Sequence, residues 1–402
     1  MKSCRFCKNE LKTEFVNLGM QPPSNAYIKP ENDHKMENFF PLITYVCENC
    51  KLVQTVDFNS CEDLFTNDYA YFSSYSNTWL EHAKKYVDMI SEKLSLNNDS
   101  QVIEIASNDG YLLQYFNEKS IPSLGIEPCR SVASVAIAKG VNTMVEFFGE
   151  EMAAKLPKAD LILGNNVLAH VPDINDFMAG VQIALKPDGV VTFEFPHLLN
   201  LMNFVQFDTI YHEHYSYFSL IFIKKLFAAH GLDVFDVEQL PTHGGSLRIY
   251  GCNKGTRPIS INVENLLNDE KDLNNIETYV AFSNKVKGIK RNILELLIDI
   301  KNQGKSIVSY GAAAKGNTLF NYCGIGKDFI DYAVDLTPYK QNQLLPGVHI
   351  EIKNPDEILK TKPDYILITP WNFKEEIIGK LQYTRDWGCK FIIAIPKTEI
   401  IN

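Results

Sequence analysis

The chain has 402 residues, of which 45% are hydrophobic and 22% charged, and its formal net charge is −10. This length predicts two or three domains, because single hydrophobic cores seldom grow past roughly 250–300 residues. The acidic balance argues against the clustered Lys and Arg of a nucleic-acid surface, and no stretch reaches the roughly 18 apolar residues of a membrane span. We therefore expect neither a nucleic acid nor a membrane as a partner.

Two Cys-x-x-Cys pairs open the chain, Cys4 with Cys7 and Cys47 with Cys50. No apolar leader precedes them, which predicts a cytoplasmic protein, and reducing conditions there favour metal ligation over disulfides. Four thiolates at this spacing can close a tetrahedral Zn²⁺ site. Because such a site leaves no open coordination position, we expect the zinc to be structural.

The region that follows has a different pattern. Residues 1–75 are aromatic and irregular, with Pro22-Pro23 interrupting any regular element, and a stretch of helical period runs from Trp79 to Leu94. From Gln101 onward, short apolar runs alternate with amphipathic segments, which predicts an α/β fold with a parallel sheet covered on both faces. The expected strands are 102–106, 124–127, 143–145, 160–163 and 190–193.

A polar, His-rich insertion, 196–218, interrupts this rhythm, and one or two long helices are expected within 268–303. A second α/β unit begins at Ser306, because apolar runs again alternate with helical segments. Its expected strands are 306–311, 330–335, 365–368 and 390–395. The chain is thus expected to divide into residues 1–75, 76–255 and 256–402.

The segment Glu104 to Gly110 ends the first of these strands and opens a helix at Tyr111. Small residues in such a turn let the backbone approach a ligand, and the helix N-terminus offers unpaired N–H groups. The Gly-x-Gly-x-x-Gly fingerprint of dinucleotide binders is absent, but Glu127 ends the next strand, where a carboxylate can accept both ribose hydroxyls. Phe147 and Phe148 either sandwich a base or belong to the core.

Titratable side chains gather at two further places. His170 follows the fourth expected strand, at the sheet edge where ligands bind. The insertion supplies Tyr211-His212-Glu213-His214-Tyr215, a set that is expensive to bury without a function. A zinc site is one interpretation, but the helical His-Glu-x-x-His spacing is absent. We favour general acid–base chemistry, because His titrates near neutral pH and a neighbouring Glu can fix its tautomer.

The last unit repeats the strand–turn–helix pattern at Tyr310 to Thr318. Lys315 beside free N–H groups suits a phosphate, although the pattern is not a Walker A loop and an ordinary tight turn is the alternative. Asp335 ends the next strand and is a second candidate ribose carboxylate. Two nucleoside sites, one for a cofactor and one for a nucleotide-carrying substrate, are therefore expected.

In this order, the motifs resemble a known family, the S-adenosylmethionine-dependent C-methyltransferases that act on nucleotide-linked 4-keto-deoxy sugars. The resemblance extends over essentially the whole chain and specifies the family much more than the sugar. It is carried by the cysteine pairs and by residues 18–25, 69–76, 104–110, 211–214, 243–248 and 310–318.

The resemblance implies a zinc-binding N-terminal domain, a central class I methyltransferase domain of Rossmann-like fold, and a C-terminal Rossmann-like domain that helps to hold a nucleotide-sugar. It implies S-adenosylmethionine in the central pocket and structural Zn²⁺. His170, Tyr211, Glu213 and His214 would surround the sugar, with His214 the leading candidate base and Tyr71 closing the site. We also expect a monomer.

Candidate residues can be assigned to two ligand sites. The methyl-donor pocket is expected to involve Glu104, Ala106, Asn108, Gly110, Tyr111, Glu127, Pro128, Phe147, Phe148, Asn165 and Asn166. The nucleotide-sugar is expected to contact Tyr310, Gly311, Ala314, Lys315, Asn317, Thr318, Asp335 and Arg248.

The hypothesis for the reaction is that His214 or His170 removes a sugar C3–H made acidic by the 4-keto group, and that the enolate carbon then takes the methyl group. Three alternatives stay open at this point: a methyltransferase acting on oxygen or nitrogen, an NAD-dependent dehydrogenase, and a zinc-ribbon binding module. The missing glycine fingerprint disfavours the second, and the acidic charge disfavours the third.

Overall fold

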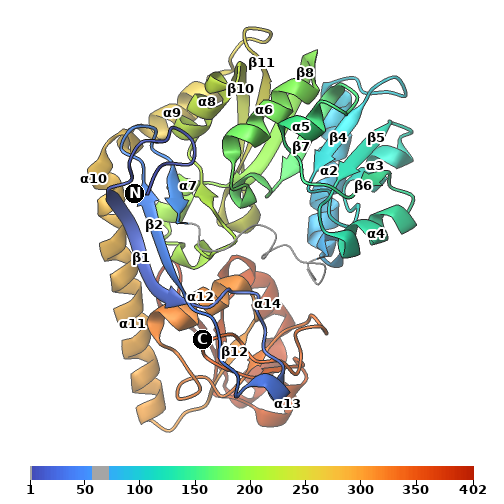
Figure 1. Cartoon of the computed structure of the whole chain (residues 1–402). Coiled ribbons are helices and arrows are strands. Elements are labelled where there is room, and N and C mark those ends of the chain that lie inside the picture. Colours follow the sequence, from blue (N-terminus) through green and yellow to red (C-terminus); the bar gives the residue numbers. More distant parts are fainter. Residues whose placement is uncertain (1, 57–71) are drawn as a thin grey trace.

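Three β-sheets organise the protein, whose computed structural model describes residues 2–56 and 72–402. Their strand orders are β1-β2-β3-β9, β10-β11-β8-β7-β4-β5-β6 and β14-β13-β12-β15-β16-β17 (Figure 1). The first sheet comprises β1 (Thr13–Gln21), β2 (Phe40–Val46), β3 (Val53–Thr55) and β9 (Ser216–Tyr217). The second comprises β4 (Val102–Ile105), β5 (Ser123–Ile126), β6 (Thr143–Met144), β7 (Ala159–Asn165), β8 (Leu185–Pro196), β10 (Leu232–Leu240) and β11 (Ser246–Asn253). The third comprises β12 (Ile307–Tyr310), β13 (Ala333–Val334), β14 (Ile352–Lys353), β15 (Tyr365–Ile368), β16 (Lys390–Ile393) and β17 (Glu399–Ile401).

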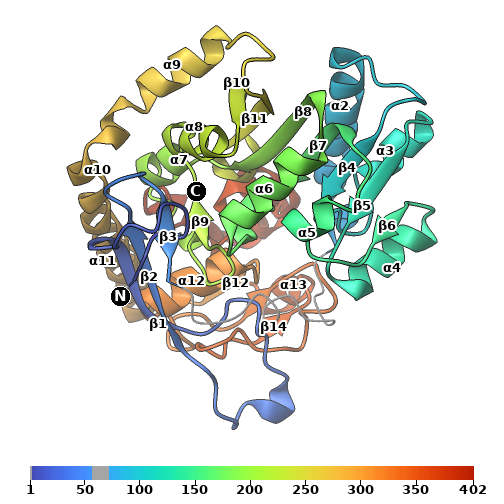
Figure 2. The same ribbon diagram turned by 45° about the horizontal axis from the view of Figure 1, so that its top comes forward.

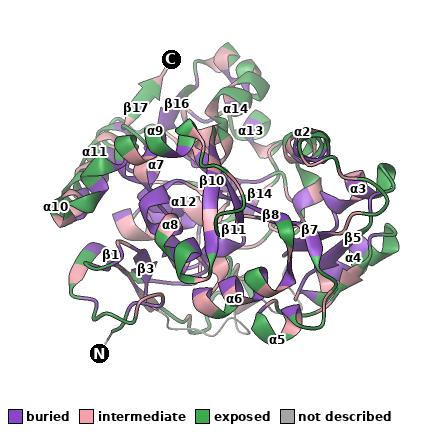
Figure 3. Ribbon diagram, turned by 90° about the horizontal axis from the view of Figure 1, so that it is seen from above, coloured by how far each residue is buried: buried purple, intermediate pink, exposed green. Residues whose placement is uncertain are grey.

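Helices surround these sheets. In the central domain they are α2 (Asn77–Lys93), α3 (Leu113–Glu118), α4 (Arg130–Ala138), α5 (Glu150–Ala153), α6 (Ile174–Ala184), α7 (Leu198–Asn203) and α8 (Leu220–Ala229). Further along the chain come α9 (Ile261–Asp269), α10 (Ile276–Val280), α11 (Phe282–Asn302), α12 (Ala314–Cys323), α13 (Glu357–Thr361) and α14 (Lys374–Lys380). Buried residues concentrate on the strands and on the inward faces of the helices, whose outward faces are exposed (Figure 3).

The central sheet follows the expected α/β pattern. Its strands β6, β5, β4, β7 and β8 are mutually parallel, and β11 and β10 add an antiparallel edge. The first strand, β4, lies in the interior of the sheet, so the carboxyl ends of β4, β5 and β7 meet at one edge where ligands bind in such folds. All four residues of β4 are buried because helices cover both faces.

The N-terminal sheet departs from the irregular structure expected for residues 1–75. In β2 the buried residues Leu42, Thr44 and Val46 alternate with partly exposed ones, the period of a strand with one covered face. Phe15 of β1 stacks on Phe282 of α11 with ring centroids 4.5 Å apart, so this sheet packs on the long helix. Figures 1 and 2 both show β1 beside α11.

Segments remote in sequence join the three domains. Strand β9 comes from the His-rich insertion, yet it pairs with β3 of the N-terminal sheet. A loop of the N-terminal domain crosses to the C-terminal domain, where Ile28 bridges Leu344 and the Glu37 carboxylate accepts the N–H of Gly347. Among the described residues, no helix is long and apolar enough to cross a membrane.

Candidate active site

The four cysteines predicted as metal ligands lie together. Their sulfur atoms are all within 4.8 Å of one another, and the Sγ–Sγ distances are 3.6 Å for Cys4 to Cys50 and 3.5 Å for Cys7 to Cys47. A tetrahedron with Zn–S bonds of about 2.3 Å has edges of about 3.8 Å, so the thiols fit Zn²⁺. Four protein ligands close such a site and assign it a structural role.

The same backbone turn shapes both cysteine pairs. The N–H of Lys8 donates to the carbonyl of Cys4, and the N–H of Lys51 donates to the carbonyl of Cys47, each at 2.9 Å. Both lysines have left-handed backbones, with φ of 60° and 71°. The two turns therefore present their thiols in equivalent ways.

The turn after β4 has a backbone that few side chains adopt. Ala106, Asn108 and Gly110 have φ of 57°, 50° and 75°. A Cβ on Gly110 would lie 2.9 Å from Cγ2 of Val141, so glycine is needed for packing as well as for conformation. Alternating backbone of this kind can point successive N–H groups at a ligand.

Two buried carboxylates flank this turn. Oε2 of Glu104 is buried without a hydrogen-bond partner, and burial raises the pKa of its carboxyl well above the usual range. Glu127 accepts the backbone N–H groups of Asn108 at 3.0 Å and Cys129 at 2.9 Å, and burial raises its pKa as well. An orphaned buried oxygen at the carboxyl edge of a sheet suits a polar ligand, since leaving it unpaired is costly.

The remaining residues of the predicted methyl-donor pocket are spread around the same edge. Pro128 lies between Glu127 and the start of α4, and Asn165 ends β7, where its amide donates to the Tyr111 hydroxyl at 3.4 Å. The two phenylalanines differ, because Phe147 is half exposed whereas Phe148 packs edge-on against the core ring of Phe177. Of the two, Phe147 is the better candidate to contact a base.

The predicted catalytic side chains meet around one turn between the 3₁₀ helix η4 (Phe207–Thr209) and β9. The imidazoles of His170 and His214 have ring centroids 4.7 Å apart. Nε2 of His214 lies 2.8 Å from the Tyr211 hydroxyl, and Nδ1 of His170 lies 2.8 Å from the backbone carbonyl of Glu213. These four residues therefore form one cluster.

Backbone carbonyls set the tautomers of both histidines. Nδ1 of His214 lies 2.9 Å from the carbonyl oxygen of Thr209, which can only accept, so Nδ1 carries the proton and Nε2 is the basic atom. The Tyr211 hydroxyl then donates to that Nε2. By the same argument Nε2 is the basic atom of His170.

Burial keeps these imidazoles neutral. It lowers the pKa of His170 to about 4, and it lowers that of His214 well below its usual value, with the nearby His170 adding to the effect. A neutral imidazole can accept a proton, which is the property that a general base requires. The pKa of the Glu213 carboxyl is raised by burial.

All three domains hold this turn, defined here as the catalytic loop, residues 207–215. From the N-terminal domain, the Asn25 amide donates to Glu213 at 2.7 Å and the Thr55 hydroxyl donates to the His214 carbonyl at 3.0 Å. From the C-terminal domain, Nε1 of Trp371 donates to Asp208 at 2.7 Å. The catalytic loop therefore lies where the three domains meet.

His212 behaves differently from its neighbours in the loop. It is buried, its ring contacts that of Phe40 edge-on at 6.0 Å, and neither ring nitrogen has a hydrogen-bond partner in the described part of the chain. A metal cluster containing His212 and His214 is not found among the described residues, where the one group of potential ligands is the cysteine set.

The C-terminal turn has the conformation expected for a close backbone approach. Gly311 has φ of 97°, and a Cβ there would lie 2.6 Å from Cδ of Pro370. Asp335 accepts the N–H of Ala312 at 2.8 Å and that of Thr337 at 2.9 Å, so its carboxylate braces the turn. Tyr310 is buried at the end of β12, and Ala314 begins α12.

Of three polar side chains in this motif, those of Thr318 and Lys315 lie at the domain interface. Thr318 donates to the carbonyl of Ile210 in the catalytic loop at 3.2 Å, and Asn317 is fully buried. Nζ of Lys315 lies 4.7 Å from the centre of the Trp371 ring and donates to Asn372 at 3.3 Å. Because Trp371 also donates to Asp208, Lys315 lies near the catalytic loop. Burial lowers the pKa of Lys315, and the charge of this lysine contributes to the lowered pKa of His214.

Arg248 is placed in an ion-pair network. Its guanidinium is almost fully buried and contacts Glu194 at 2.9 Å and Glu238 at 3.1 Å. Both partners belong to the central sheet, so the geometry favours a structural role over the substrate contact that the motif suggested. Tyr71 lies outside the described residues.

Sequence reasoning missed several residues that the fold brings to the site. Asn25 and Thr55 of the N-terminal domain and Trp371 of the C-terminal domain hold the catalytic loop, in which Asp208 accepts from Trp371. Asn25 was noticed only as the end of the motif at 18–25, and no local pattern marks the other three. His243 was noticed only as part of the motif at 243–248. Its position between two buried strands and its two following glycines are the signal that could have singled it out.

Known proteins of similar sequence identify the family of this chain. Three family models match: a zinc binding domain over residues 4–65, a methyltransferase domain over 79–237, and a C-methyltransferase C-terminal domain over 241–396. C-methyltransferase NovU of Streptomyces niveus is 34% identical over 409 residues, which cover 99% of this chain and 96% of that protein.

Solved structures are more distant. The YcgJ protein of Bacillus subtilis has 15% identity and a TM-score of 0.36, covering 44% of this chain and 100% of its own. Magnesium protoporphyrin IX methyltransferase of Synechocystis has 13% identity and a TM-score of 0.34, covering 48% and 89%. Because these TM-scores are low, the assignment rests on the family models and on the curated relative. The chain belongs to the C-methyltransferase family, as its motifs predicted.

Proposed function

We propose that the protein transfers a methyl group from S-adenosylmethionine to C3 of a nucleotide-linked 4-keto-deoxy sugar. The observation that carries this proposal is the cluster of two neutral histidines and Tyr211 where the three domains meet. A carbon must lose a proton before it can act as a nucleophile, so a C-methyltransferase needs a base, whereas transfer to an amine does not.

The methyl donor would lie along the carboxyl edge of the central sheet. Glu127 can accept ribose hydroxyls with its remaining lone pairs. The left-handed turn at Ala106 to Gly110 would let the amino-acid portion of S-adenosylmethionine approach the backbone closely. When bound, S-adenosylmethionine supplies an electrophilic methyl group. The orphaned oxygen of Glu104 supports this placement, because a ligand donor there would satisfy it.

The nucleotide-sugar would extend from the C-terminal turn to the catalytic loop. Lys315 at the start of α12 is suited to a phosphate, and the same helix contacts the catalytic loop through Thr318. In this arrangement the C3 proton is removed by Nε2 of His170, or by Nε2 of His214 once the Tyr211 hydroxyl has rotated away from it, while the C–H electron pair moves toward the 4-keto oxygen. The catalytic loop orients the sugar, and orientation supplies much of the rate. Zinc takes no part.

Deuterium exchange tests the base directly. Incubated in D₂O with a panel of 4-keto nucleotide-sugars and no methyl donor, the wild-type protein should introduce deuterium at C3 of the accepted sugar, as mass spectrometry would show. His214→Gln or His170→Gln should slow this exchange about 10²–10⁴-fold, the usual contribution of general-base catalysis. Wild-type turnover in both variants would contradict the assignment.

Methylation of an oxygen or nitrogen is the competing function. It needs no exchange at carbon, so methylation of an accepted sugar without any deuterium uptake would favour it. Membership of the C-methyltransferase family favours the carbon.

A further inference from the structure

The loop joining β10 to β11 combines strain with a titratable side chain. His243 has φ of 54° and ψ of 21°, and Gly244 and Gly245 follow with φ of 87° and 112°. Few residues other than glycine occupy this left-handed region, although histidine is among those enriched in it, and the surroundings hold such a conformation in place. The loop, Thr242 to Gly245, belongs neither to the catalytic loop nor to the two predicted ligand-binding turns.

Contacts on both sides enforce this conformation. A Cβ on Gly244 would lie 2.4 Å from Cη2 of Trp371, and one on Gly245 would lie 2.3 Å from Nδ2 of Asn200. Nε2 of Gln206 donates to the carbonyl of Gly244 at 2.8 Å. The loop is thus pressed between the C-terminal domain and the segment that leads into the catalytic loop.

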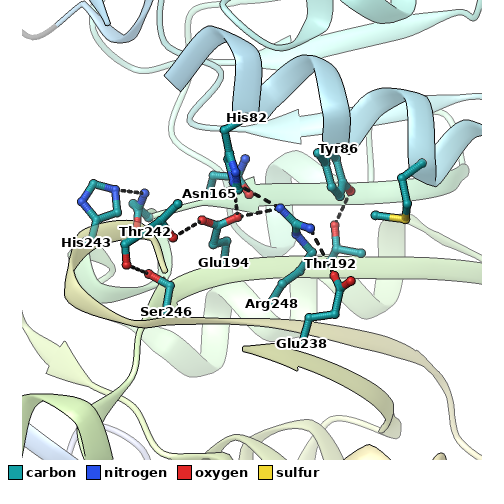
Figure 4. Close-up of polar contacts among 12 residues, drawn as sticks. His82, Tyr86, Asn165, Thr192, Glu194, Glu238, Thr242, His243, Ser246 and Arg248 are labelled. Atoms are coloured by element: carbon teal, nitrogen blue, oxygen red, sulfur yellow. Dashed lines mark hydrogen bonds and ion pairs between the residues drawn. The ribbon is translucent and has the colours of Figure 1, made fainter. Parts of the chain in front are cut away.

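A buried carboxylate anchors the loop to the central sheet. Glu194, fully buried near the end of β8, accepts the Thr242 hydroxyl at 2.9 Å and also contacts His82 at 2.8 Å and Arg248 at 2.9 Å (Figure 4). Burial alone would raise the pKa of this carboxyl, but His82 and Arg248 outweigh it, so the pKa is lowered. The anchor is therefore a charged group, and charged hydrogen bonds are the strong ones.

The imidazole of His243 lies between the two predicted ligand sites. On the methyl-donor side, Nε2 lies 3.2 Å from Nδ2 of Asn166, and the ring meets that of Trp79 edge-on at 5.4 Å. Trp79 in turn stacks on Tyr111 at 6.0 Å. On the other side, the following residue, Gly244, packs against Trp371, and Nζ of Lys315 lies 4.7 Å from the centre of that same ring.

The contact with Asn166 fixes the proton on His243. With Nδ2 of Asn166 facing the ring, this amide nitrogen donates to Nε2, and on that basis we assign the proton of the neutral ring to Nδ1. Nδ1 has no hydrogen-bond partner within residues 2–56 and 72–402, and in Figure 4 the loop carries the ring away from the Glu194 network. Burial lowers the pKa of His243 to about 4, with the charge of Lys315 adding to this, so the ring is neutral at pH 7.

We propose that His243 is a substrate-contacting residue of the methyl transfer, whose Nδ1–H donates a hydrogen bond to the carbonyl oxygen beside the carbon that is methylated. The proposal rests on the proposed function. The base takes the C3 proton, the C–H electron pair forms the enolate, and the negative charge develops on the oxygen that His243 contacts. The enolate carbon then bonds the methyl carbon as the S–CH₃ bond breaks, the sulfur keeps that electron pair, and the oxygen returns to a carbonyl.

A neutral imidazole suits this role. It donates a hydrogen bond without surrendering its proton to the enolate, and a donor held in place by the protein stabilises charge without having to reorganise. His243 thereby acts opposite His214, one as the donor to oxygen and the other as the base at carbon.

Two substitutions distinguish the loss of the imidazole donor from strain of the backbone at residue 243. His243→Gly removes the donor without straining the left-handed backbone, and His243→Asn keeps an N–H donor near the position of Nδ1 in a residue that tolerates positive φ. We expect kcat and C3 deuterium exchange of the glycine variant to fall together about 10²–10³-fold, with KM nearly unchanged, and the asparagine variant to recover at least about tenfold.

The matched control is His230→Asn, because His230 also contacts an asparagine, Asn175 at 3.1 Å, but at the far end of α8. It should keep wild-type kcat. The wild-type protein is measured in the same assay. If it neither exchanges nor methylates the sugar, the proposed function fails, whereas a difference between the variants tests His243 alone. Wild-type exchange in His243→Gly, a loss confined to KM, or no recovery in His243→Asn would overturn the role of His243.

Discussion

Buried, neutral histidines determine how the site responds to pH. Burial lowers the pKa of His170 to about 4 and that of His214 well below its usual value. A base acts only in its deprotonated form, so a lowered pKa moves the acid limit of activity downward. We expect kcat/KM to stay flat from about pH 8 to about pH 5 and to fall below that, in a steady-state pH profile with the accepted sugar.

Folding must be followed in the same experiment. The unfolded chain binds a proton at each imidazole below about pH 6.5, whereas in the folded chain the pKa of His170 is lowered to about 4 and that of His214 is also lowered. The stability that these groups contribute is therefore fully present above about pH 6.5 and declines as the pH falls. Circular dichroism at each pH separates the two effects. An acid limb centred near pH 6.5 in folded protein would contradict the lowered pKa values.

At the scale of elements, the catalytic loop depends on hydrogen bonds from other domains. Burial raises the pKa of the Asp208 carboxyl to about 6, while the charge of Lys315 and the hydrogen bond from Trp371 oppose this rise. The loop carries Tyr211 and His214 three and six residues further on. The position of the catalytic loop therefore depends on contacts with the C-terminal domain.

Trp371→Phe tests this coupling, because it keeps a ring but removes the donor to Asp208. We expect a loss of about 1–3 kcal/mol in unfolding free energy, the cost of an unsatisfied buried group. Turnover should fall by about tenfold or more, since small displacements of reacting groups are costly. Calorimetric affinity for S-adenosylmethionine should not change, because its predicted pocket belongs to the central sheet.

Trp387→Phe is the matched control. Nε1 of Trp387 donates to the carbonyl of Pro363 at 3.0 Å within the C-terminal domain, away from the catalytic loop. This variant should lose stability to a similar extent but keep kcat. Equal turnover in the two variants would show that the bond to Asp208 does not position the loop.

At the scale of the whole molecule, the zinc site supports one wall of the active site. Cys47 and Cys50 lead into β3, which pairs with β9, and Thr55 at the end of β3 holds His214. A closed four-thiol site does no chemistry, but metal binding and folding are coupled. Loss of the metal should therefore act on the catalytic loop through the N-terminal sheet.

Removing zinc with a chelator should lower the melting temperature and raise KM before it changes kcat of the folded fraction. Replacing Zn²⁺ by Co²⁺ should restore the melting temperature and give the same kcat, because the metal does not touch the substrate. Cys389→Ser, a buried thiol outside the cluster, is the control for thiol loss. A kcat that changes with the identity of the metal would contradict a structural role.

Much of the chain was predictable because its signals are local. Apolar runs predicted β4, β7 and β12, and the turns at Glu104 to Gly110 and Tyr310 to Thr318 follow their strands as expected. The N-terminal sheet was not predicted, because β3 is completed by β9 from the insertion, more than 150 positions along the chain. The divisions near residues 75 and 255 stay predictions.

The sequence by itself determined the family, the cysteine set, the α/β class and the identity of His170, Tyr211, Glu213 and His214 as candidates. Each of these follows from local signals, namely the spacing of motif residues, the pattern of apolar runs, or a position next to an expected strand. Only the tertiary structure decided the contacts of single atoms: the Tyr211 hydroxyl at Nε2 of His214, the ion pairs of Arg248, and the packing of His243 against Asn166 and Trp79. The physical reason is that a tautomer, a pKa or a strained loop depends on groups contributed by distant segments, and their proximity exists only once the three domains are packed.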